Sequence, residues 1–401
     1  MPAGHTSHVR RRLRSLDALA ATAAIWFLAK FLRYAFPPLF PELSTRYGVT
    51  DATLGLAFTA MLLVYALLQF PAGAIADRIG ASVVITAGAA VAGVAALALS
   101  LDAPFVVLVG AMVLVGVGTG VHKTVAIGLL STVYTERPGR ALGVLDTAGA
   151  LAGVAAPAAV AFCLTSPRVT WHAVFLAGGL LGLSLAVLAH RWLGAREPER
   201  DDGDDERVPL RRYAALFRRP AFAGFVLVTV GFSFAYNGVV AFLPRYLETA
   251  GLTPATASAV YGSLFVVSLV QTVTGDLADR IGALRVIVAT LAVATVGLLA
   301  LIAVGGGAGI VTLVGVVVVF GLGSHGFRPV RGAYLMALLP ADVSGGGLGV
   351  VRTVLMGAGA IAPGVVGVVS TYAGFRAAFG VLWVALAVAA VAAGVLLVTD
   401  R

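Results

Sequence analysis

The chain has 401 residues, of which 59% are apolar and only 12% are charged. Soluble globular proteins average about half apolar and about a quarter charged residues, so this composition excludes a water-soluble fold. The mean hydropathy of +0.97 predicts an integral membrane protein instead. The net charge of +9 does not indicate nucleic-acid binding, because the basic residues are scattered over short loops and apolar segments. The single cysteine, Cys163, excludes an internal disulfide and a cysteine-built metal site, and its apolar neighbours predict a buried residue.

Apolar runs separated by glycine, proline or charged residues predict an all-α fold with twelve transmembrane helices. The first span follows four arginines, as in a signal peptide, but it is long and no cleavage site follows it, so we expect an uncleaved helix. The predicted spans of the first half are residues 17–39, 52–75, 81–101, 105–131, 141–164 and 171–193. Those of the second half are residues 221–244, 255–277, 283–304, 309–335, 346–370 and 374–398.

The distribution of basic residues predicts the orientation of these helices, because Lys and Arg accumulate in cytoplasmic loops. Counted loop by loop, with the adjoining helix ends, 18 basic residues fall on the side that holds both termini and only 4 on the opposite side. We therefore expect a multi-pass protein of the cell membrane with both termini in the cytoplasm. The central stretch 191–220 is highly charged, and we expect a flexible cytoplasmic linker there.

The two halves of the chain repeat one unit. Residues 69–81 read QFPAGAIADRIGA and residues 271–283 read QTVTGDLADRIGA, at an offset of 202. Residues 142–147 likewise match residues 348–353. Two similar halves in the same orientation are typical of alternating-access transporters. They predict two six-helix bundles related by pseudo-twofold symmetry, with the N-terminal bundle over 1–190, the linker over 191–220 and the C-terminal bundle over 221–401.

The loop sequence GAIADRIG at 73–80 and its second copy at 275–282 resemble the G-x-L-A-D-R-x-G motif of the major facilitator superfamily. The resemblance covers essentially the whole chain and implies a secondary transporter that works by rocker-switch alternating access. Neither copy continues directly with the two basic residues that usually follow the motif, which implies a thinner gating network. The residues that the resemblance assigns to gating are Gly73, Asp77, Arg78, Gly80, Gly275, Asp279, Arg280 and Gly282.

These loop residues also have a simple physical reading. Glycine permits a tight turn, and Asp77 and Asp279 either cap a helix or pair with a neighbouring arginine. A plain solvated turn is the alternative, and an Asp77→Asn variant with full transport activity would favour it.

Ionisable residues inside the predicted spans are the strongest functional signal, because each uncompensated charge near mid-bilayer costs at least ~2.5–3.5 kcal/mol. Six of them are cations, against one clear carboxylate, Asp146. His122 and His325 would add positive charge when protonated. The six cations are Lys30, Arg33, Lys123, Arg328, Arg331 and Arg352.

Lys123 and Arg328 occupy equivalent positions in the two halves, at an offset of 205. Pseudo-twofold symmetry then predicts two cations on opposite walls of one central cavity. Neither has a fixed counter-ion nearby in sequence, so they suit a bound carboxylate, phosphate or sulfate-like group. The alternative is that the intramembrane cations hold helices together through backbone carbonyls and Asp146. That alternative is stronger for Asp146 and Arg352, whose equivalent positions and opposite charges predict a salt bridge that closes an inner gate.

Tyr236 and Asn237, the only asparagine in the chain, precede Gly238. They predict either a locally broken helix facing the cavity or ordinary interhelical hydrogen bonding. We expect the substrate-binding residues to be Lys30, Arg33, His122, Lys123, Tyr236, Asn237, Arg328 and Arg331.

The sequence thus predicts a monomeric transporter of a small, anionic organic or inorganic solute, with no cofactor or metal and with Asp146 and His122 as candidates for proton coupling. The second hypothesis is proton-coupled efflux of drugs or lipophilic compounds. It ranks below anion transport because the sequence lacks the helix-4 arginine and helix-5 Gly-Pro motifs typical of such antiporters, and because cavity cations would repel cationic cargo. A transport-dead membrane sensor on the same fold is a third. The sequence holds no catalytic constellation that would predict an enzyme.

Overall fold

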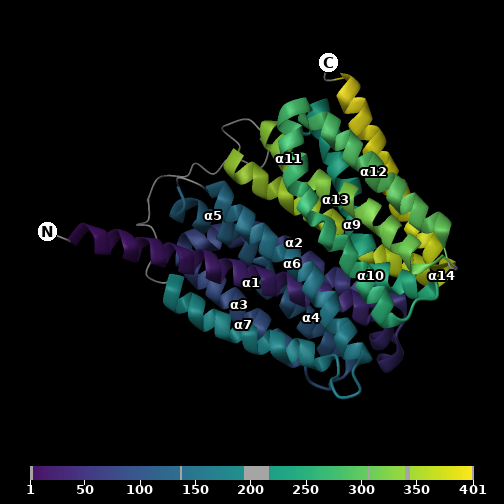
Figure 1. Ribbon diagram of the computed structural model, residues 1–401, viewed down its shortest axis with the longest axis horizontal. Helices are drawn as coiled ribbons and strands as arrows, with labels where there is room; N and C mark the ends of the chain where they lie inside the picture. Colours follow the sequence, from purple (N-terminus) through teal and green to yellow (C-terminus); the bar gives the residue numbers. More distant parts are fainter. Residues whose placement is uncertain (1–2, 136–137, 194–215, 306–307, 339–343, 400–401) are drawn as a thin grey trace. The chain divides into compact units, whose positions relative to one another are not determined.

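The computed structural model describes the backbone of residues 3–135, 138–193, 216–305, 308–338 and 344–399, and the side chains of 17–69, 71–135, 139–193, 216–305, 308–338 and 353–399. Every regular element in these ranges is helical (Figure 1). The first half holds α1 (Ala3–Tyr47), α2 (Asp51–Ile79), α3 (Ala81–Leu99), α4 (Phe105–Gly120), α5 (His122–Val133), α6 (Pro138–Thr165) and α7 (His172–Leu193). The second half holds α9 (Pro220–Thr249), α10 (Pro254–Val266), the 3-10 turn η1 (Val267–Leu269), α11 (Val270–Ile281), α12 (Ala283–Val304), α13 (Ile310–Leu338) and α14 (Ser344–Thr399).

Eleven helical stretches in the described ranges are long and apolar enough to cross a membrane. One of them, Phe105–Val133, combines α4 and α5. The last, Thr353–Thr399, holds two segments, because Gly374 has the non-helical dihedral angles φ 81° and ψ 164°. The predicted all-α fold with twelve spans is therefore confirmed.

The first helix is longer than its sequence suggests. We expected it to end at residue 39, near a group of prolines, but α1 continues through Pro37, Pro38 and Pro41 to Tyr47. A proline removes one backbone donor, and burial of the same stretch offsets that cost. Phe40 shows this burial, because its ring lies 5.6 Å from Phe58 and 5.2 Å from Phe242.

The chain divides into two compact units. The first comprises Met1–Ala35, Val64–Ala159 and Ser166–Asp204, and the second comprises Phe36–Leu63, Val160–Thr165 and Asp205–Arg401. Residues 36–63 and 160–165, which the sequence places in the predicted N-terminal bundle, group with the second unit. The bundle bounds 1–190 and 221–401 stay a prediction. Helices α1 and α2 therefore contribute to both cores.

The internal repeat appears in the packing of each unit. A Cβ atom on Gly118 of α4 would overlap the backbone of Gly88 and Ala92 on α3. A Cβ atom on Gly323 of α13 would likewise overlap the backbone of Thr290 and Ala294 on α12. Glycine lets the two backbones of each pair approach closely, as is common between membrane helices.

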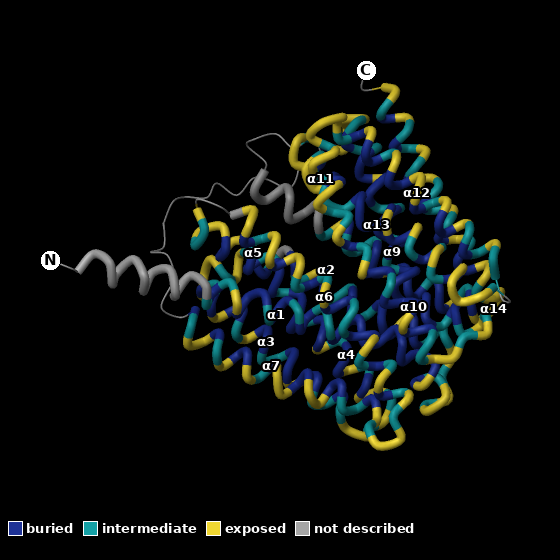
Figure 2. The backbone as a smooth tube through the Cα atoms, in the orientation of Figure 1, coloured by how far each residue is buried: buried dark blue, intermediate teal, exposed yellow. Residues whose placement is uncertain are grey.

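The helices differ in how much of their surface is covered. Burial is greatest along α9, where 72% of the most apolar window is buried, and least along Thr353–Thr399, where 28% is (Figure 2). Exposed valines such as Val384, Val391 and Val398 occupy the second segment of α14. In a membrane protein such a surface faces lipid.

Candidate functional site

Three cations of the first unit surround one buried indole, that of Trp26. The ammonium groups of Lys30 and Lys123 lie 5.1 Å and 5.0 Å from the centroid of the Trp26 ring, and the Arg33 guanidinium carbon lies 5.7 Å from it. Trp26, Lys30 and Arg33 are four and seven residues apart on α1, so they share one face of the helix. We call Trp26, Lys30, Arg33, His122 and Lys123 the Trp26 cluster.

Arg33 is the most deeply buried cation of this cluster, at 6% exposure. Its Nε donates a hydrogen bond to the carbonyl of Ala29 at 3.3 Å, and its guanidinium carbon lies 4.0 Å from the centroid of the Tyr65 ring. Its Nη2 atom is buried and makes no hydrogen bond to any described residue. A buried guanidinium N–H is a strong donor, so Arg33 retains capacity to bind an anion.

The residues that α5 adds to the cluster follow a break between α4 and α5 at Val121. The His122 ring stacks on Trp26 with centroids 6.1 Å apart, and its Nε2 donates to the carbonyl of Thr22 at 2.9 Å. A carbonyl only accepts, so the proton of a neutral His122 lies on Nε2. Nδ1 is buried and makes no hydrogen bond to the described residues, which leaves it as an acceptor.

Lys123 forms an ion pair with Asp146 of α6. No counter-ion was expected near Lys123 in the sequence, and the fold supplies one from another helix, as the alternative that involves Asp146 predicts. Sequence reasoning missed the pair because the two residues are 23 positions apart on different helices. The side chain of Arg352, the partner that we expected for Asp146, lies outside the described residues, so that salt bridge stays a prediction.

In the second unit, an aromatic group surrounds His325. Its ring lies 5.9 Å from that of Tyr236 on α9 and 6.1 Å from that of Phe265 on α10. The Arg328 guanidinium carbon lies 5.7 Å from the centroid of the Tyr236 ring. The structure thus brings Tyr236 and Arg328 together, whereas Arg331 is partly exposed one turn further along α13.

The predicted break at Tyr236–Asn237 is wrong, because α9 is continuous from Pro220 to Thr249. The Asn237 side chain donates to the carbonyl of Ser233 at 2.8 Å, within its own helix, rather than to a neighbouring one. Gly238 serves packing, since a Cβ atom there would overlap the side chain of Leu382.

The two loop motifs adopt the same turn. Helix α2 ends just before Gly80 (φ 98°, ψ 140°), and α11 ends just before Gly282 (φ 97°, ψ 140°). Asp77 and Asp279 lie exposed in the last turns of these helices. Gly73 and Arg78 are on α2 with Asp77, and Gly275 is on α11 with Asp279. Neither Asp77 nor Asp279 caps a helix, because the N-caps of α3 and α12 are the two glycines themselves. Arg280 pairs with Asp276 at 2.7 Å, a partner that we had not predicted.

A third group was not found from the sequence. It joins the first part of α2 to α14 within the second unit, and we call it the α2–α14 seam: Asp51, Gly55 and Thr59 against Pro363, Gly364 and Gly367. The Gly364 amide donates to Thr59 Oγ1 at 2.8 Å. Beside the seam, Arg245 of α9 donates to Asp51 at 3.2 Å and lies 3.8 Å from Glu248. Asp51 and Arg245 are 194 residues apart, so no sequence spacing indicates the pair.

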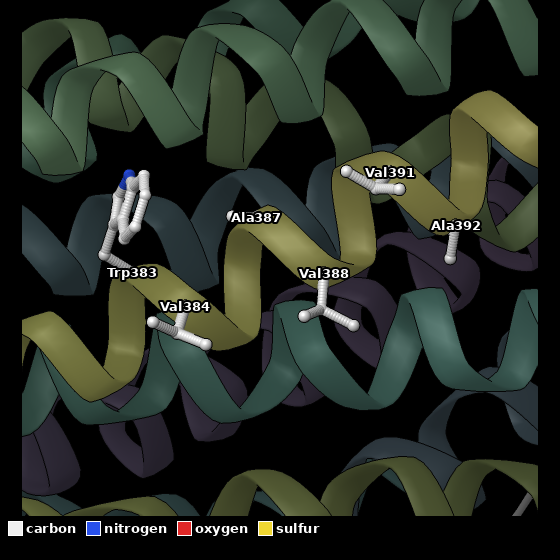
Figure 3. Close-up of a pocket in the computed structure, with 6 residues that line it drawn as sticks. All are labelled: Trp383, Val384, Ala387, Val388, Val391 and Ala392. Carbon is white, nitrogen blue, oxygen red and sulfur yellow. The ribbon is translucent and has the colours of Figure 1, made fainter.

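A surface concavity on α14 lies away from all these residues. It is lined by Trp383, Val384, Ala387, Val388, Val391 and Ala392, which are all on this helix (Figure 3). Its lining carries no charge, and its valines are exposed. This concavity has the character of a lipid-facing surface, and none of the predicted substrate-binding residues lines it.

Three curated relatives are similar to the chain over different extents. An uncharacterized transporter, YycB, of Bacillus subtilis (strain 168) is 27% identical over 303 residues, which are 73% of this chain and 72% of that protein. A probable 4-methylmuconolactone transporter of Cupriavidus pinatubonensis (strain JMP 134) is 24% identical over 368 residues, 88% of this chain and 84% of the relative. The 4-hydroxybenzoate transporter PcaK of Pseudomonas aeruginosa is 32% identical, but over only 173 residues, 43% of this chain and 36% of the relative.

The fold also matches a solved structure, that of a bacterial homolog of the human lysosomal transporter Spinster, in an inward-facing and occupied conformation. The TM-score is 0.79 at 18% sequence identity, over 96% of this chain and 97% of the other. The family model described as Major Facilitator Superfamily matches residues 22–271 and 262–401. With the repeated loop motif and the twelve helical spans, this match leads to one conclusion: the chain belongs to the major facilitator superfamily.

Proposed function

We propose that this protein is a secondary active transporter that moves a small anion, with a carboxylate or sulfonate group, across the membrane by rocker-switch alternating access. The family and the curated relatives support the coarser part of this proposal, a transporter of small molecules. The observation that carries the finer part is the Trp26 cluster. Three cations share one indole there, and one of them, Lys123, forms an ion pair with Asp146.

The cations of the Trp26 cluster are costly to bury in a membrane unless an anion accompanies them. Each uncompensated charge in the bilayer costs at least ~2.5–3.5 kcal/mol. A desolvated cation–π contact stabilises a cation by about 2 kcal/mol. Contacts with one indole therefore do not offset the cost of placing three cations in the bilayer. Asp146 compensates Lys123, and the buried Arg33 Nη2, which makes no hydrogen bond to a described residue, favours an anion as its partner.

The names of relatives are consistent with anionic cargo. One is a 4-hydroxybenzoate transporter, and another, a probable sulfoacetate transporter of Cupriavidus necator, is 26% identical over 284 residues. Both solutes carry an acidic group that is ionised at neutral pH. Carboxylates and sulfonates offer the oxygen acceptors that Arg33 Nη2 and the lysine ammonium groups would bind.

We assign substrate binding to two groups. In the first unit these are Lys30, Arg33, His122 and Lys123, and in the second they are Tyr236, Asn237, Arg328 and Arg331. A shared cavity for the two groups remains part of the proposal. Conformational change is assigned to the residues of the two loop motifs and to Asp146 with Arg352.

One relative favours a second candidate function. Multidrug resistance protein D of Escherichia coli (strain K12) is 24% identical over 232 residues, 58% of this chain. Efflux of lipophilic compounds would not need the buried charge of Arg33, and uncharged substitutions there would leave such efflux unchanged.

Counterflow in proteoliposomes tests the proposal. The panel is 4-hydroxybenzoate, sulfoacetate, inorganic phosphate and a lipophilic cation such as tetraphenylphosphonium. We expect saturable uptake of at least one anion, reduced at least tenfold by Arg33→Gln. Arg168→Gln, which removes an exposed arginine from the loop after α6, is the matched control and should retain uptake. Saturable uptake of the cation alone would establish the efflux alternative, and uptake of no solute would favour a sensor.

A further inference from the structure

Two polar atoms of the Trp26 cluster are buried and have no hydrogen-bond partner among the described residues. One is Nη2 of Arg33 and the other is Nδ1 of His122. Arg33 is 6% exposed and His122 is 1% exposed, and nearly all polar atoms buried to this degree in folded proteins are paired. Each atom therefore indicates a partner that the described part of the chain does not supply.

The other contacts of each group fix the direction of its unpaired atom. The Arg33 guanidinium donates through Nε to a backbone carbonyl of its own helix at 3.3 Å, and its carbon lies 4.0 Å from the centroid of the Tyr65 ring. The His122 ring stacks on Trp26 and donates through Nε2 to the Thr22 carbonyl at 2.9 Å. Rotation of either side chain would break these contacts, so neither atom gains a partner by a change of rotamer.

Gln69 of α2 fixes the backbone that carries His122. At the break between α4 and α5, the Gln69 amide donates to the carbonyl of Gly120, the last residue of α4, at 2.6 Å. On the other side of the break, the Thr124 hydroxyl donates to the Gln69 carbonyl oxygen at 2.9 Å. Gln69 is 2% exposed, so this bridge lies inside the protein. His122 lies between the two bridged residues, and its imidazole is therefore held by a fixed backbone.

The two unpaired atoms have opposite hydrogen-bonding character. A guanidinium N–H donates to a carboxylate or sulfonate oxygen, whereas the nitrogen of a neutral imidazole that carries no proton accepts. Both groups contact the same indole, since the Arg33 guanidinium carbon lies 5.7 Å and the His122 ring 6.1 Å from that of Trp26. One solute the size of a substituted benzoate spans both groups when its acidic end faces Arg33 and an O–H or N–H group faces His122.

We propose that the transported anion carries a hydrogen-bond donor in addition to its acidic group, and that His122 Nδ1 accepts this hydrogen bond while Arg33 Nη2 binds the acidic group. The inference rests on the proposed function and adds a rule of selection among anions of similar size and charge. An anion without a donor leaves Nδ1 desolvated and unpaired, and sites of this kind discriminate strongly against such analogues. His122 is then a specificity-determining residue.

The test compares matched solutes in counterflow with the full wild-type chain in proteoliposomes. 4-Fluorobenzoate has the charge and nearly the shape of 4-hydroxybenzoate but no donor, whereas a phenol keeps its proton at neutral pH, as tyrosine does. The 3-substituted pair covers the other ring position. We expect the half-saturation concentration of the fluorinated solute to be at least about tenfold higher in one pair. Equal values in both pairs would overturn the inference and would indicate that Nδ1 binds an internal water instead.

Other transported solutes give equally clear results. If phosphate is the transported anion of the panel, sulfate replaces the fluorinated solute, because it has no proton to donate at neutral pH. Transport of sulfoacetate, which has no donor, without transport of a donor-bearing anion would overturn the inference and leave the proposed function intact. Absence of any anion counterflow contradicts the proposed function itself.

Variants assign the preference to His122. His122→Phe keeps a flat ring beside Trp26 and removes the acceptor, so it should lose the preference for the hydroxyl group. Arg33→Gln should weaken the binding of both solutes of a pair. His190→Phe, which replaces an exposed histidine of α7, is the matched control and should keep the wild-type preference. An unchanged preference in His122→Phe would overturn the inference, and the comparison of solutes on the wild type stays valid if this variant does not fold.

Discussion

At the scale of single residues, Trp26 is the centre of the first unit. Its indole is buried, and its neighbours include three cations and the His122 ring. The position of the indole depends on Gly149 of α6, because a Cβ atom there would overlap the indole nitrogen and Cδ1 of Trp26. Nothing in the local sequence shows which side chain Gly149 faces, so the contact could not be predicted.

Gly149→Ala should therefore disturb the Trp26 cluster. We expect a stability loss of about 1–3 kcal/mol, the usual cost of overpacking, together with weaker anion counterflow, because the indole must move. Thermal unfolding of the purified protein and the counterflow assay measure the two effects. Gly143→Ala on the same helix is the control, since a Cβ atom there meets nothing within 4 Å. Equal behaviour of the two variants would contradict a role of Gly149 in positioning Trp26.

Arg33 offers a second prediction at this scale. Its guanidinium stacks on Tyr65 at 4.0 Å while Nη2 stays available as a donor. Lysine keeps the charge but has neither the flat face nor the forked donors, so Arg33→Lys should lower anion affinity about tenfold. Isothermal titration with the transported anion measures the change. Unaltered affinity would show that charge alone matters at this position.

At the scale of elements, the α2–α14 seam depends on small residues. Gly55 of α2 lies against the backbone of Pro363 on α14, and Gly367 of α14 lies against the backbone of Asp51. Because each contact is to backbone, a larger residue has no flexible side chain to displace. The ion pair between Asp51 and Arg245 adds α9 to the same assembly.

Gly367→Ala should accordingly separate α2 from α14. The expected loss is about 1–3 kcal/mol of stability, visible as a lower midpoint of thermal unfolding. Gly357→Ala, earlier on α14, is the matched control, because nothing lies within 4 Å of its added Cβ atom. A midpoint for Gly367→Ala as high as that of the control would show that the seam is looser than its geometry indicates.

The elements also show what the sequence could and could not predict. The spans and the two loop motifs were predictable, because long apolar runs and a repeated motif can be recognised in the sequence without the fold. The end of α1 was missed because the three prolines at 37, 38 and 41 normally stop a helix, and burial in the second unit overrides that tendency. The Lys123–Asp146 and Asp51–Arg245 pairs were missed because each joins helices that only the tertiary fold brings together.

At the scale of the whole molecule, the repeat is a property of conformation as well as of sequence. The turns at Gly80 and Gly282 have nearly the same dihedral angles, in a region that side-chain-bearing residues rarely adopt. The close contacts at Gly118 and Gly323 are likewise equivalent. Each half thus uses glycine at two equivalent places, the turn after the loop motif and a close contact between two helices.

This equivalence predicts equal penalties in the two halves. Gly80→Ala and Gly282→Ala should each cost about 1–3 kcal/mol, because alanine is strained at a φ near +98°. The two losses should add in the double variant, since the glycines lie in different units and share no partner. Thermal unfolding of the single and double variants checks both points. Gly332→Ala, in a helical and open position of α13, should show no loss.

The allocation of residues 36–63 to the second unit has a consequence for how the protein is made. Residues 36–63 are synthesised well before α9 and α14. They therefore cannot pack against these helices until the second half of the chain has been made. A polypeptide that began at residues 191–220 would lack α2. Its helices would insert into the membrane, but Gly364 and Gly367, which contact α2 in the whole protein, would be exposed to lipid. Two separate half-chains of this transporter should therefore give a working protein only when both are made in the same cell. The first half supplies residues 36–63, without which the second half cannot complete its packing.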